Sequence, residues 1–149
     1  MARGRVTDYV VGFAFSRDAR RVLLVRKQRP AWQRGRFNGI GGHVEEGELP
    51  LEAMRREFFE ETDLLTSLRD WCHFAVVLTE RSRVFVFAAR LDLDAARTTT
   101  DERIAAVDVE KVGRAHIVPN LAWLVPLALR ARDLPVPALV HEAAHYEAA

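Results

Sequence analysis

The order of apolar and polar residues along the chain predicts several strands and two helices. Runs rich in β-branched and aromatic residues, bounded by turn residues, are typical of strands. They cover residues 9–15, 21–25, 38–44, 72–78 and 84–89. Residues 51–62 and 121–130 have the helical pattern instead. Strands mixed with helices indicate a layered α/β or α+β fold.

The first predicted helix has clear signals for both its start and its buried face. Pro50 stands where a helix favours its first residue, shortly after a break at Gly47. Apolar side chains then recur every three or four residues, which is the helical period. This stripe contains Leu51, Met54, Phe58, Thr62 and Leu65.

The second helix and the segments around it carry weaker signals. Asn120 is a candidate N-cap, and Pro126 is expected to kink the helix that follows. Residues 91–103 are polar and are expected to form a loop. The tail after Pro135 shows little order beyond a short helix over residues 141–149.

Length and composition are typical of a globular protein of one domain. The chain has 149 residues, of which 49% are apolar, and this predicts one domain over residues 1–149. No apolar run approaches the ~20 residues of a membrane span, and the net charge of +1 argues against a dedicated binder of nucleic acid polymers. The single cysteine, Cys72, is expected to be a buried, reduced thiol. We therefore expect a soluble, cytoplasmic protein, as a monomer or a homodimer.

The charges are unevenly distributed. Residues 1–36 contain ten Lys and Arg against two Asp, a balance of +8, whereas residues 37–66 contain two Arg against eight acids, a balance of −6. Two solvated faces explain this pattern. A site in which cations hold a polyanion while carboxylates hold a metal explains it equally well.

Three carboxylates in the first helix are candidates for the metal ligands of the second interpretation. Glu57, Glu60 and Glu61 stand at i, i+3 and i+4, so their side chains converge on one face. Like charges in this arrangement repel one another unless a cation lies between them. A hard cation such as Mg²⁺ prefers such oxygen ligands and bridges them to phosphates. By themselves, the three carboxylates are also compatible with an ordinary solvated acidic face.

The spacing of the residues around these carboxylates resembles the signature of the Nudix hydrolases. That signature is G-x5-E-x7-R-E-U-x-E-E-x-G-U, where U is a bulky aliphatic residue. The matching residues here are Gly42, Glu48, Arg56, Glu57, Phe58, Glu60, Glu61 and Leu64. Asp63 departs from the signature because it replaces the glycine that follows the helix. Asp tolerates a positive φ better than most residues, so we expect a small loss of stability rather than of activity.

The resemblance extends beyond the signature to the MutT branch of the family, over residues 22–65 and 98–129. It implies a Nudix-type α/β/α sandwich with a mixed β-sheet. It further implies Mg²⁺-dependent hydrolysis, with Mn²⁺ as a substitute, of a nucleoside triphosphate to the monophosphate and pyrophosphate. Damaged dNTPs such as 8-oxo-dGTP are the expected substrates. The alternatives are hydrolysis of another nucleoside diphosphate linked to a group X, and a non-catalytic module that binds a nucleotide.

The resemblance also assigns roles to residues of the signature. Glu57, Glu60 and Glu61 would bind the metal together with the carbonyl of Gly42, and Glu57 would activate the attacking water. Arg56 resembles the arginine that orients a carboxylate. Catalysis is thus expected to depend on Glu57, Arg56 and Glu61.

Four residues outside the signature complete the expected site. Glu102 matches a loop glutamate that reaches the metal in relatives, or else is a solvated acid. Lys27 would contact the phosphates or the sugar, or else is a lysine at a strand end. Asn38 and Asn120 are candidates for reading the base, because an amide both donates and accepts hydrogen bonds. Otherwise Asn38 is a turn residue and Asn120 only an N-cap.

A competing motif lies near the end of the chain. His141 and His145 form an H-E-x-x-H pattern, by which a helix can present two zinc ligands and a base. No usual third ligand follows them, unless Glu147 serves, and we interpret the segment as an alanine-rich tail. A stoichiometric amount of zinc in the purified protein would revive the zinc-protease interpretation.

Overall fold

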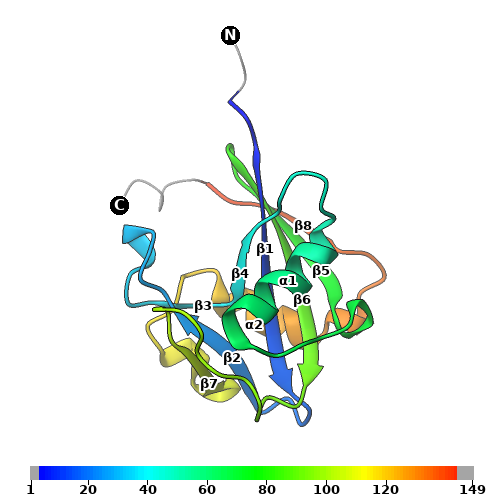
Figure 1. Cartoon of the computed structure of the whole chain (residues 1–149). Coiled ribbons are helices and arrows are strands. Elements are labelled where there is room, and N and C mark those ends of the chain that lie inside the picture. Colours follow the sequence, from blue (N-terminus) through cyan, green and yellow to red (C-terminus); the bar gives the residue numbers. More distant parts are fainter. Residues whose placement is uncertain (1–3, 144–149) are drawn as a thin grey trace.

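The computed structural model describes residues 4–143, which form a mixed β-sheet between two helical layers (Figure 1). The strands are β1 (Thr7–Ser16), β2 (Arg21–Arg26), β3 (Phe37–Asn38), β4 (Ile40–His43), β5 (Cys72–Leu78), β6 (Ser82–Leu91), β7 (Ile104–Asp108) and β8 (Ala138–His141). The helices are α1 (Pro50–Thr62) and α2 (Leu121–Leu129). Short 3₁₀ turns are η1 (Ala31–Gln33), η2 (Leu68–Asp70), η3 (Val109–Arg114) and η4 (Ala131–Asp133).

The centre of the sheet is the parallel pair of β1 and β6, which are in register from Thr7 opposite Ser82 to Ser16 opposite Leu91. The other side of β1 is shared between two antiparallel partners. Its first half pairs with β4, and its second half pairs with β2. Since one strand pairs with two neighbours, β2 and β4 diverge from β1. Strand β3 lies beside β2, and β7 pairs with β2 as well.

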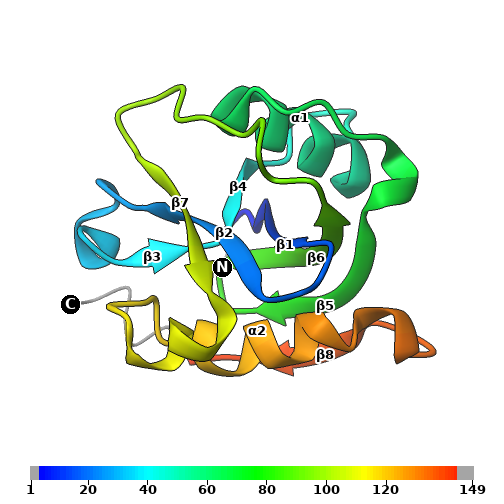
Figure 2. The ribbon, with the colours of Figure 1, turned by 90° about the horizontal axis from the view of Figure 1, so that it is seen from below.

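Helix α1 covers one face of the sheet and helix α2 the other (Figure 2), and each face has its own core. Helix α1 packs Met54 and Phe58 against one face, and both side chains are fully buried. Helix α2 packs Leu121 and Leu124 against the opposite face. The predicted α/β/α sandwich with a mixed sheet is confirmed.

Helix α1 begins and ends as the sequence indicates. Pro50 is its first residue, and the Glu52 carboxylate accepts a hydrogen bond of 3.1 Å from the backbone N–H of Leu49. Asp63 ends the helix in the left-handed conformation, with φ of 58°. Because the helix ends there, Leu65 no longer lies on its buried face and is 77% exposed. The prediction that Leu65 continues the buried stripe was wrong.

The structure contains two strands that the sequence analysis did not predict, β7 and β8. Strand β8 pairs with β5, and its last residue is His141. The predicted tail helix therefore does not begin at His141, and the remainder of that prediction, including His145, lies outside the described residues.

Two smaller predictions need correction. Asn120 occupies the N-cap position of α2 but makes no capping hydrogen bond through its side chain. Cys72 is only partly buried, although it is a free cysteine as expected. No helix in the described range is long and apolar enough to cross a membrane.

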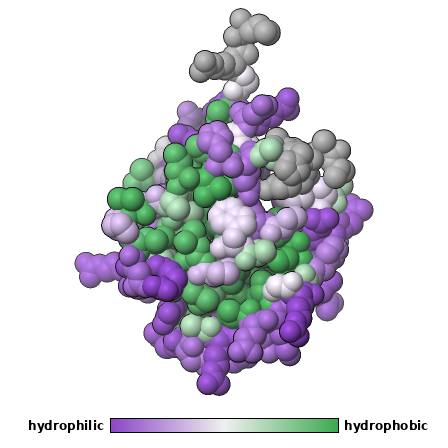
Figure 3. Space-filling view, turned by 180° about the vertical axis from the view of Figure 1, so that it is seen from behind, coloured by the Kyte–Doolittle hydropathy of each residue, from purple (hydrophilic) through white to green (hydrophobic). Residues whose placement is uncertain are grey.

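Apolar side chains also reach the surface on the side of α2 and β8, which faces away from the viewer in Figure 1 (Figure 3). Val136 and Leu139 are each 69% exposed there. The acidic residues of the signature lie on the α1 side of the sheet.

Candidate active site

The candidate site lies where α1 crosses β4. Gly42 in β4 is next to Glu57 in α1, so that a Cβ added to Gly42 would lie 2.5 Å from the Glu57 carboxyl carbon. The side chain of Glu57 is only 15% exposed, and burial raises its pKa. The absence of a side chain at Gly42 therefore lets a half-buried carboxylate rest against the strand.

This close approach predicts a large effect for a small substitution. In Gly42→Ala the new methyl group will displace the Glu57 carboxylate, and a displacement of about 1 Å at a reacting group costs about 100-fold in rate. We expect that loss in kcat with little change in Tm, measured by steady-state kinetics and thermal unfolding. Gly113→Ala is the control, because a Cβ there meets no atom within 4 Å. A Gly42→Ala enzyme with the rate of the wild type would contradict this placement.

Arg56 holds the acidic residues of the segment together. Its guanidinium donates two hydrogen bonds to Glu48, of 2.8 and 2.9 Å, and one of 2.9 Å to Glu57. It also donates to the carbonyl of His43, beside Gly42 in β4. Arg56 lowers the pKa of Glu48, while the pKa of Arg56 itself is raised. The guanidinium thus fixes α1, β4 and the connecting loop in one arrangement.

Glu61 is the most perturbed carboxyl group of the site. Burial raises its pKa to about 7, and the charges of Glu57, Glu102 and Glu60 add to the effect against the opposing charge of Lys27. Its Oε2 atom is the only buried side-chain nitrogen or oxygen in residues 4–143 that lacks a hydrogen-bond partner. A buried carboxylate oxygen without a partner is unfavourable, so a ligand bound at this atom would supply the interaction that it lacks.

The raised pKa of Glu61 predicts how stability depends on pH without metal. The folded state holds this proton more tightly than the unfolded chain, whose glutamate has a pKa of 4.5. Stability relative to Glu61→Gln must therefore fall as pH rises from 4.5 to about 7, and must then level off. Urea unfolding in the presence of a chelator measures this difference. A difference that does not vary across that range would show that Glu61 titrates normally.

Glu60 is the most accessible of the three signature carboxylates. Its side chain is 53% exposed and contacts Arg56 at 3.3 Å. In the conformation described, no three Asp, Glu, His or Cys side chains of residues 4–143 are gathered closely enough to hold a metal ion. The donor set nevertheless fits a hard cation, because Glu61 offers an unpartnered oxygen and Glu57 lies against Gly42.

Lys27 and Glu102 form an ion pair of 2.9 Å beside Glu61. The buried Glu102 carboxylate also accepts a hydrogen bond of 2.6 Å from the backbone N–H of Gln28. Although burial opposes it, hydrogen bonding from Gln28 and Lys27 lowers the pKa of Glu102. Both residues thus lie near the acidic cluster, as expected, but each is engaged with the other. Metal binding by Glu102 and phosphate or sugar binding by Lys27 stay predictions.

The loop that precedes Glu102 is bonded to the end of α1 through Arg97 and Thr99. The sequence analysis did not predict these contacts. Arg97 pairs with Asp63, and its backbone N–H donates to the carbonyl of Thr62. The hydroxyl of Thr99 donates to the carbonyl of Glu60. Asp63 therefore adopts the positive φ expected at this position and gains a partner that glycine lacks. The one sequence signal for the contact with Arg97 is that Asp63, which can form an ion pair, replaces the glycine of the signature.

The two candidates for reading the base differ in their surroundings. Asn38 donates to the Gln33 side chain at 3.1 Å and accepts from the N–H of Gly39 at 2.8 Å. Asn38 lies in strand β3 opposite Val25, so the interpretation of Asn38 as a turn residue was wrong. The two contacts occupy one of the two amide hydrogens and one lone pair of the amide oxygen. Asn120 is partly buried at the start of α2. The role of Asn38 and Asn120 in contacting a base stays a prediction.

Comparison with known proteins places the chain in a family. The profile of the NUDIX domain matches residues 6–126. The chain belongs to the Nudix family. This match confirms that the chain has the domain of the Nudix hydrolases, and with it the enzyme class, but it does not identify a substrate. No curated protein matches the sequence.

Solved structures share the fold at low sequence identity. A MutT structure described for Aliivibrio salmonicida and Vibrio cholerae has a TM-score of 0.72 and 18% identity, and covers 84% of this chain and 98% of its own. A Nudix hydrolase from Nitrosomonas europaea has a TM-score of 0.72 and 17% identity, with 95% and 81% covered. A bifunctional NMN adenylyltransferase/ADP ribose pyrophosphatase from Francisella tularensis, complexed with AMP and a Mn ion, has a TM-score of 0.70 and 15% identity, with 85% and 42% covered.

Proposed function

We propose that this Nudix protein hydrolyses a nucleoside triphosphate to the monophosphate and pyrophosphate, with Mg²⁺ as cofactor and Mn²⁺ as a substitute. The observation that carries the proposal is the half-buried pair of Glu57 and Glu61, one against Gly42 and the other with an unpartnered oxygen. Partial burial raises the pKa of both carboxyl groups. Such oxygens gain most from a bound cation, because its charge offsets the cost of burying theirs.

Glu57, Glu60, Glu61 and the carbonyl of Gly42 would hold the metal. Bound there, a divalent cation offsets the negative charge that develops on the phosphate oxygens. Because Glu60 is exposed and only weakly held by Arg56, it is the ligand that can turn toward the other two. We assign the donor set to these four residues and treat Glu102 as a fifth candidate.

Glu57 is the proposed proton acceptor for the attacking water. Burial raises the pKa of its carboxyl group, which makes it a stronger base than an exposed glutamate. Arg56 acts as its positioning residue, through a hydrogen bond of 2.9 Å. Lys27 is the proposed contact to the phosphates, and Asn38 and Asn120 are the proposed contacts to the base.

The finer assignment is to the MutT branch, with damaged dNTPs such as 8-oxo-dGTP as substrates. The sequence resemblance over residues 22–65 and 98–129 supports it, and the shared fold with the MutT structures is consistent with it. A free nucleotide as substrate also fits a cytoplasmic enzyme of one domain that needs neither a nucleic acid polymer nor a membrane. A Nudix module that only binds a nucleotide is the alternative, but here all three signature glutamates are present.

A panel of substrates tests this proposal. The purified protein is incubated with 8-oxo-dGTP, the common dNTPs and NTPs, ADP-ribose and a dinucleoside polyphosphate, with Mg²⁺ or with a chelator. We expect monophosphate and pyrophosphate from triphosphates only with Mg²⁺, and faster release from 8-oxo-dGTP than from dGTP. Faster cleavage of ADP-ribose than of any triphosphate would overturn the substrate class. Equal rates for 8-oxo-dGTP and dGTP would overturn the role in removing damaged nucleotides.

A further inference from the structure

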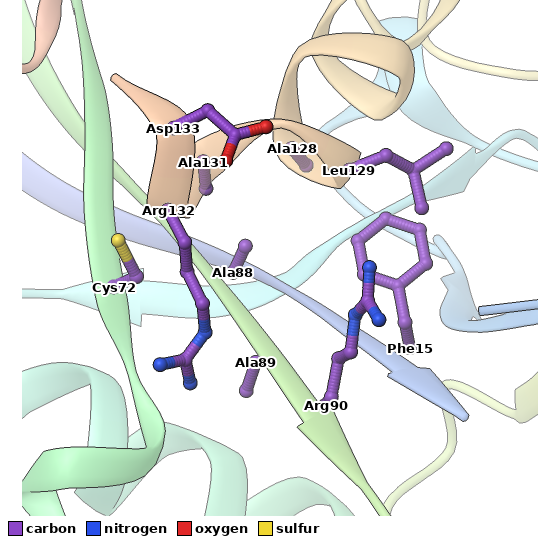
Figure 4. Close-up of a pocket in the computed structure, with 10 residues that line it drawn as sticks. All are labelled: Phe15, Cys72, Ala88, Ala89, Arg90, Ala128, Leu129, Ala131, Arg132 and Asp133. Carbon is purple, nitrogen blue, oxygen red and sulfur yellow. The ribbon is translucent and has the colours of Figure 1, made fainter. Parts of the chain in front are cut away.

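A cavity lies away from the acidic cluster, beside the end of α2. Its volume is about 250 Å³, and it opens where the ends of β1 and β6 meet the start of β5, the end of α2 and η4 (Figure 4). Four alanines line it, and they explain why it exists, because short side chains on facing elements leave space unfilled. They are Ala88 and Ala89 from β6, Ala128 from α2 and Ala131 from η4.

The cavity shares no residue with the candidate active site. Phe15, Ala88, Ala128 and Ala131 belong to the core beneath α2, whereas Ala89 belongs with Met54 and Phe58 of α1 to the core on the other face. Apart from Ala89, the buried apolar lining therefore lies on the α2 face of the sheet. A ligand in this cavity would not touch the signature glutamates.

Two arginines give the cavity a positive charge. Arg90 and Arg132 both line it, from β6 and from η4. Neither guanidinium has a hydrogen bond or an ion pair with any residue in the described range 4–143. The one carboxylate in the lining, Asp133, is paired with Arg130 at 3.0 Å and so does not neutralise them. Two unpaired guanidiniums beside an apolar floor are suited to an oxyanion, which they can bind with charge-assisted hydrogen bonds.

We propose that this cavity binds a small organic anion, with its carboxylate or phosphate group at Arg90 and Arg132. The apolar body of the ligand lies against Phe15, Ala88, Ala128 and Ala131. A volume of about 250 Å³ admits a compact molecule and not a nucleoside triphosphate, so the ligand is not the substrate proposed above. The site stands independently of the proposed hydrolase reaction.

Alanine-methyl NMR of the full chain tests the proposal at the cavity itself. The probes are phenyl phosphate, benzoate and inorganic phosphate, each titrated to about 10 mM, which detects millimolar affinity. We expect phenyl phosphate or benzoate to shift the methyl signals of the three cavity alanines on the α2 face, Ala88, Ala128 and Ala131. The signal of Ala53, which is buried beneath α1 on the other face, should stay unchanged. The better of the two organic anions identifies the head group.

Charge-neutral variants separate specific binding from general attraction. Arg90→Gln and Arg132→Gln should each weaken binding about tenfold, because each removes a charge-assisted hydrogen bond. Both arginines are exposed, so both variants should fold. Arg114→Gln, at an exposed arginine of η3, is the matched control and should bind as the wild type does.

Three results would overturn the proposal. The first is the absence of shifts at the cavity alanines with either organic anion. The second is unchanged affinity in the variants at Arg90 and Arg132. The third is equal binding of inorganic phosphate and phenyl phosphate, which would show that the apolar floor plays no part. As a second readout, alkylation of Cys72, the only cysteine and part of the lining, should slow when the cavity is occupied.

Discussion

Replacing Glu57 by Gln will lower kcat by about 10²–10⁴-fold, the range expected when a general base is lost. The variant will fold, because burial disfavours the charge of Glu57 and the neutral amide avoids that cost. Pyrophosphate release under saturating substrate measures the rate, and thermal unfolding measures stability. The loss should appear in kcat rather than in KM alone, since the base acts in the transition state.

Glu46→Gln is the matched control for this substitution. It removes one carboxylate from the same acidic segment, but Glu46 is an exposed loop residue. We expect its rate to stay within about twofold of the wild type, because exposed charges act weakly at a distance. If Glu57→Gln keeps its rate, or if both variants lose activity equally, Glu57 is not the base.

Replacing Arg56 by Ala will impair both stability and activity. It leaves the carboxylates of Glu48 and Glu57 without their shared partner, and both side chains are 15% exposed. Removing one member of such a group costs about 2–3 kcal/mol, less than in a fully buried pair. Activity should fall about 10–100-fold, as it does when a residue that orients metal ligands is lost. Urea unfolding and kinetics on the same samples measure both effects.

Arg55→Ala serves as the control for Arg56, because it removes an adjacent arginine that is exposed on α1. Its effects should be close to zero on both measurements. Arg56→Lys is the informative intermediate. A lysine keeps the charge but cannot bridge Glu48, Glu57 and His43 at once, so it should restore stability more than activity. Full recovery of activity by lysine would show that charge alone is required.

The elements with strong local signals were predictable from the sequence. The glycine break and Pro50 mark the start of α1, and the spacing of Met54 and Phe58 marks its buried face. Leu65 fits the same period, yet the left-handed turn at Asp63 ends the helix before it. The spacing of apolar residues predicts which face of a helix is buried, but it does not predict the residue at which the helix ends.

The strands that were missed depend on tertiary contacts. Strand β7 contains Ile104 and two alanines, a weak strand signal, and it forms by pairing with β2. Strand β8 follows Pro137 and pairs with β5, which lies about 60 residues earlier in the chain. Pairing with a strand that is distant in sequence leaves no signal in the local amino-acid composition, so strand propensity could not predict β7 and β8.

The candidate site was predictable in its members but not in its contacts. Helical spacing predicted that Glu57 and Glu61 share one face, and the resemblance to the Nudix signature implied that Gly42 lies beside them. The sequence did not indicate the ion pair between Lys27 and Glu102, or the ion pair between Arg97 and Asp63. These contacts join loops that are distant in sequence, and their geometry follows from the fold.

Binding of a divalent cation near the C-terminal end of α1 can be measured without knowledge of the substrate, by Mn²⁺ titration followed by EPR. We expect saturable binding to the wild type and at least about tenfold weaker binding to Glu61→Gln, which lacks the unpartnered carboxylate oxygen. Glu46→Gln should bind as the wild type does. Equal Mn²⁺ affinity in the wild type and in Glu61→Gln would show that Glu61 does not hold the cation.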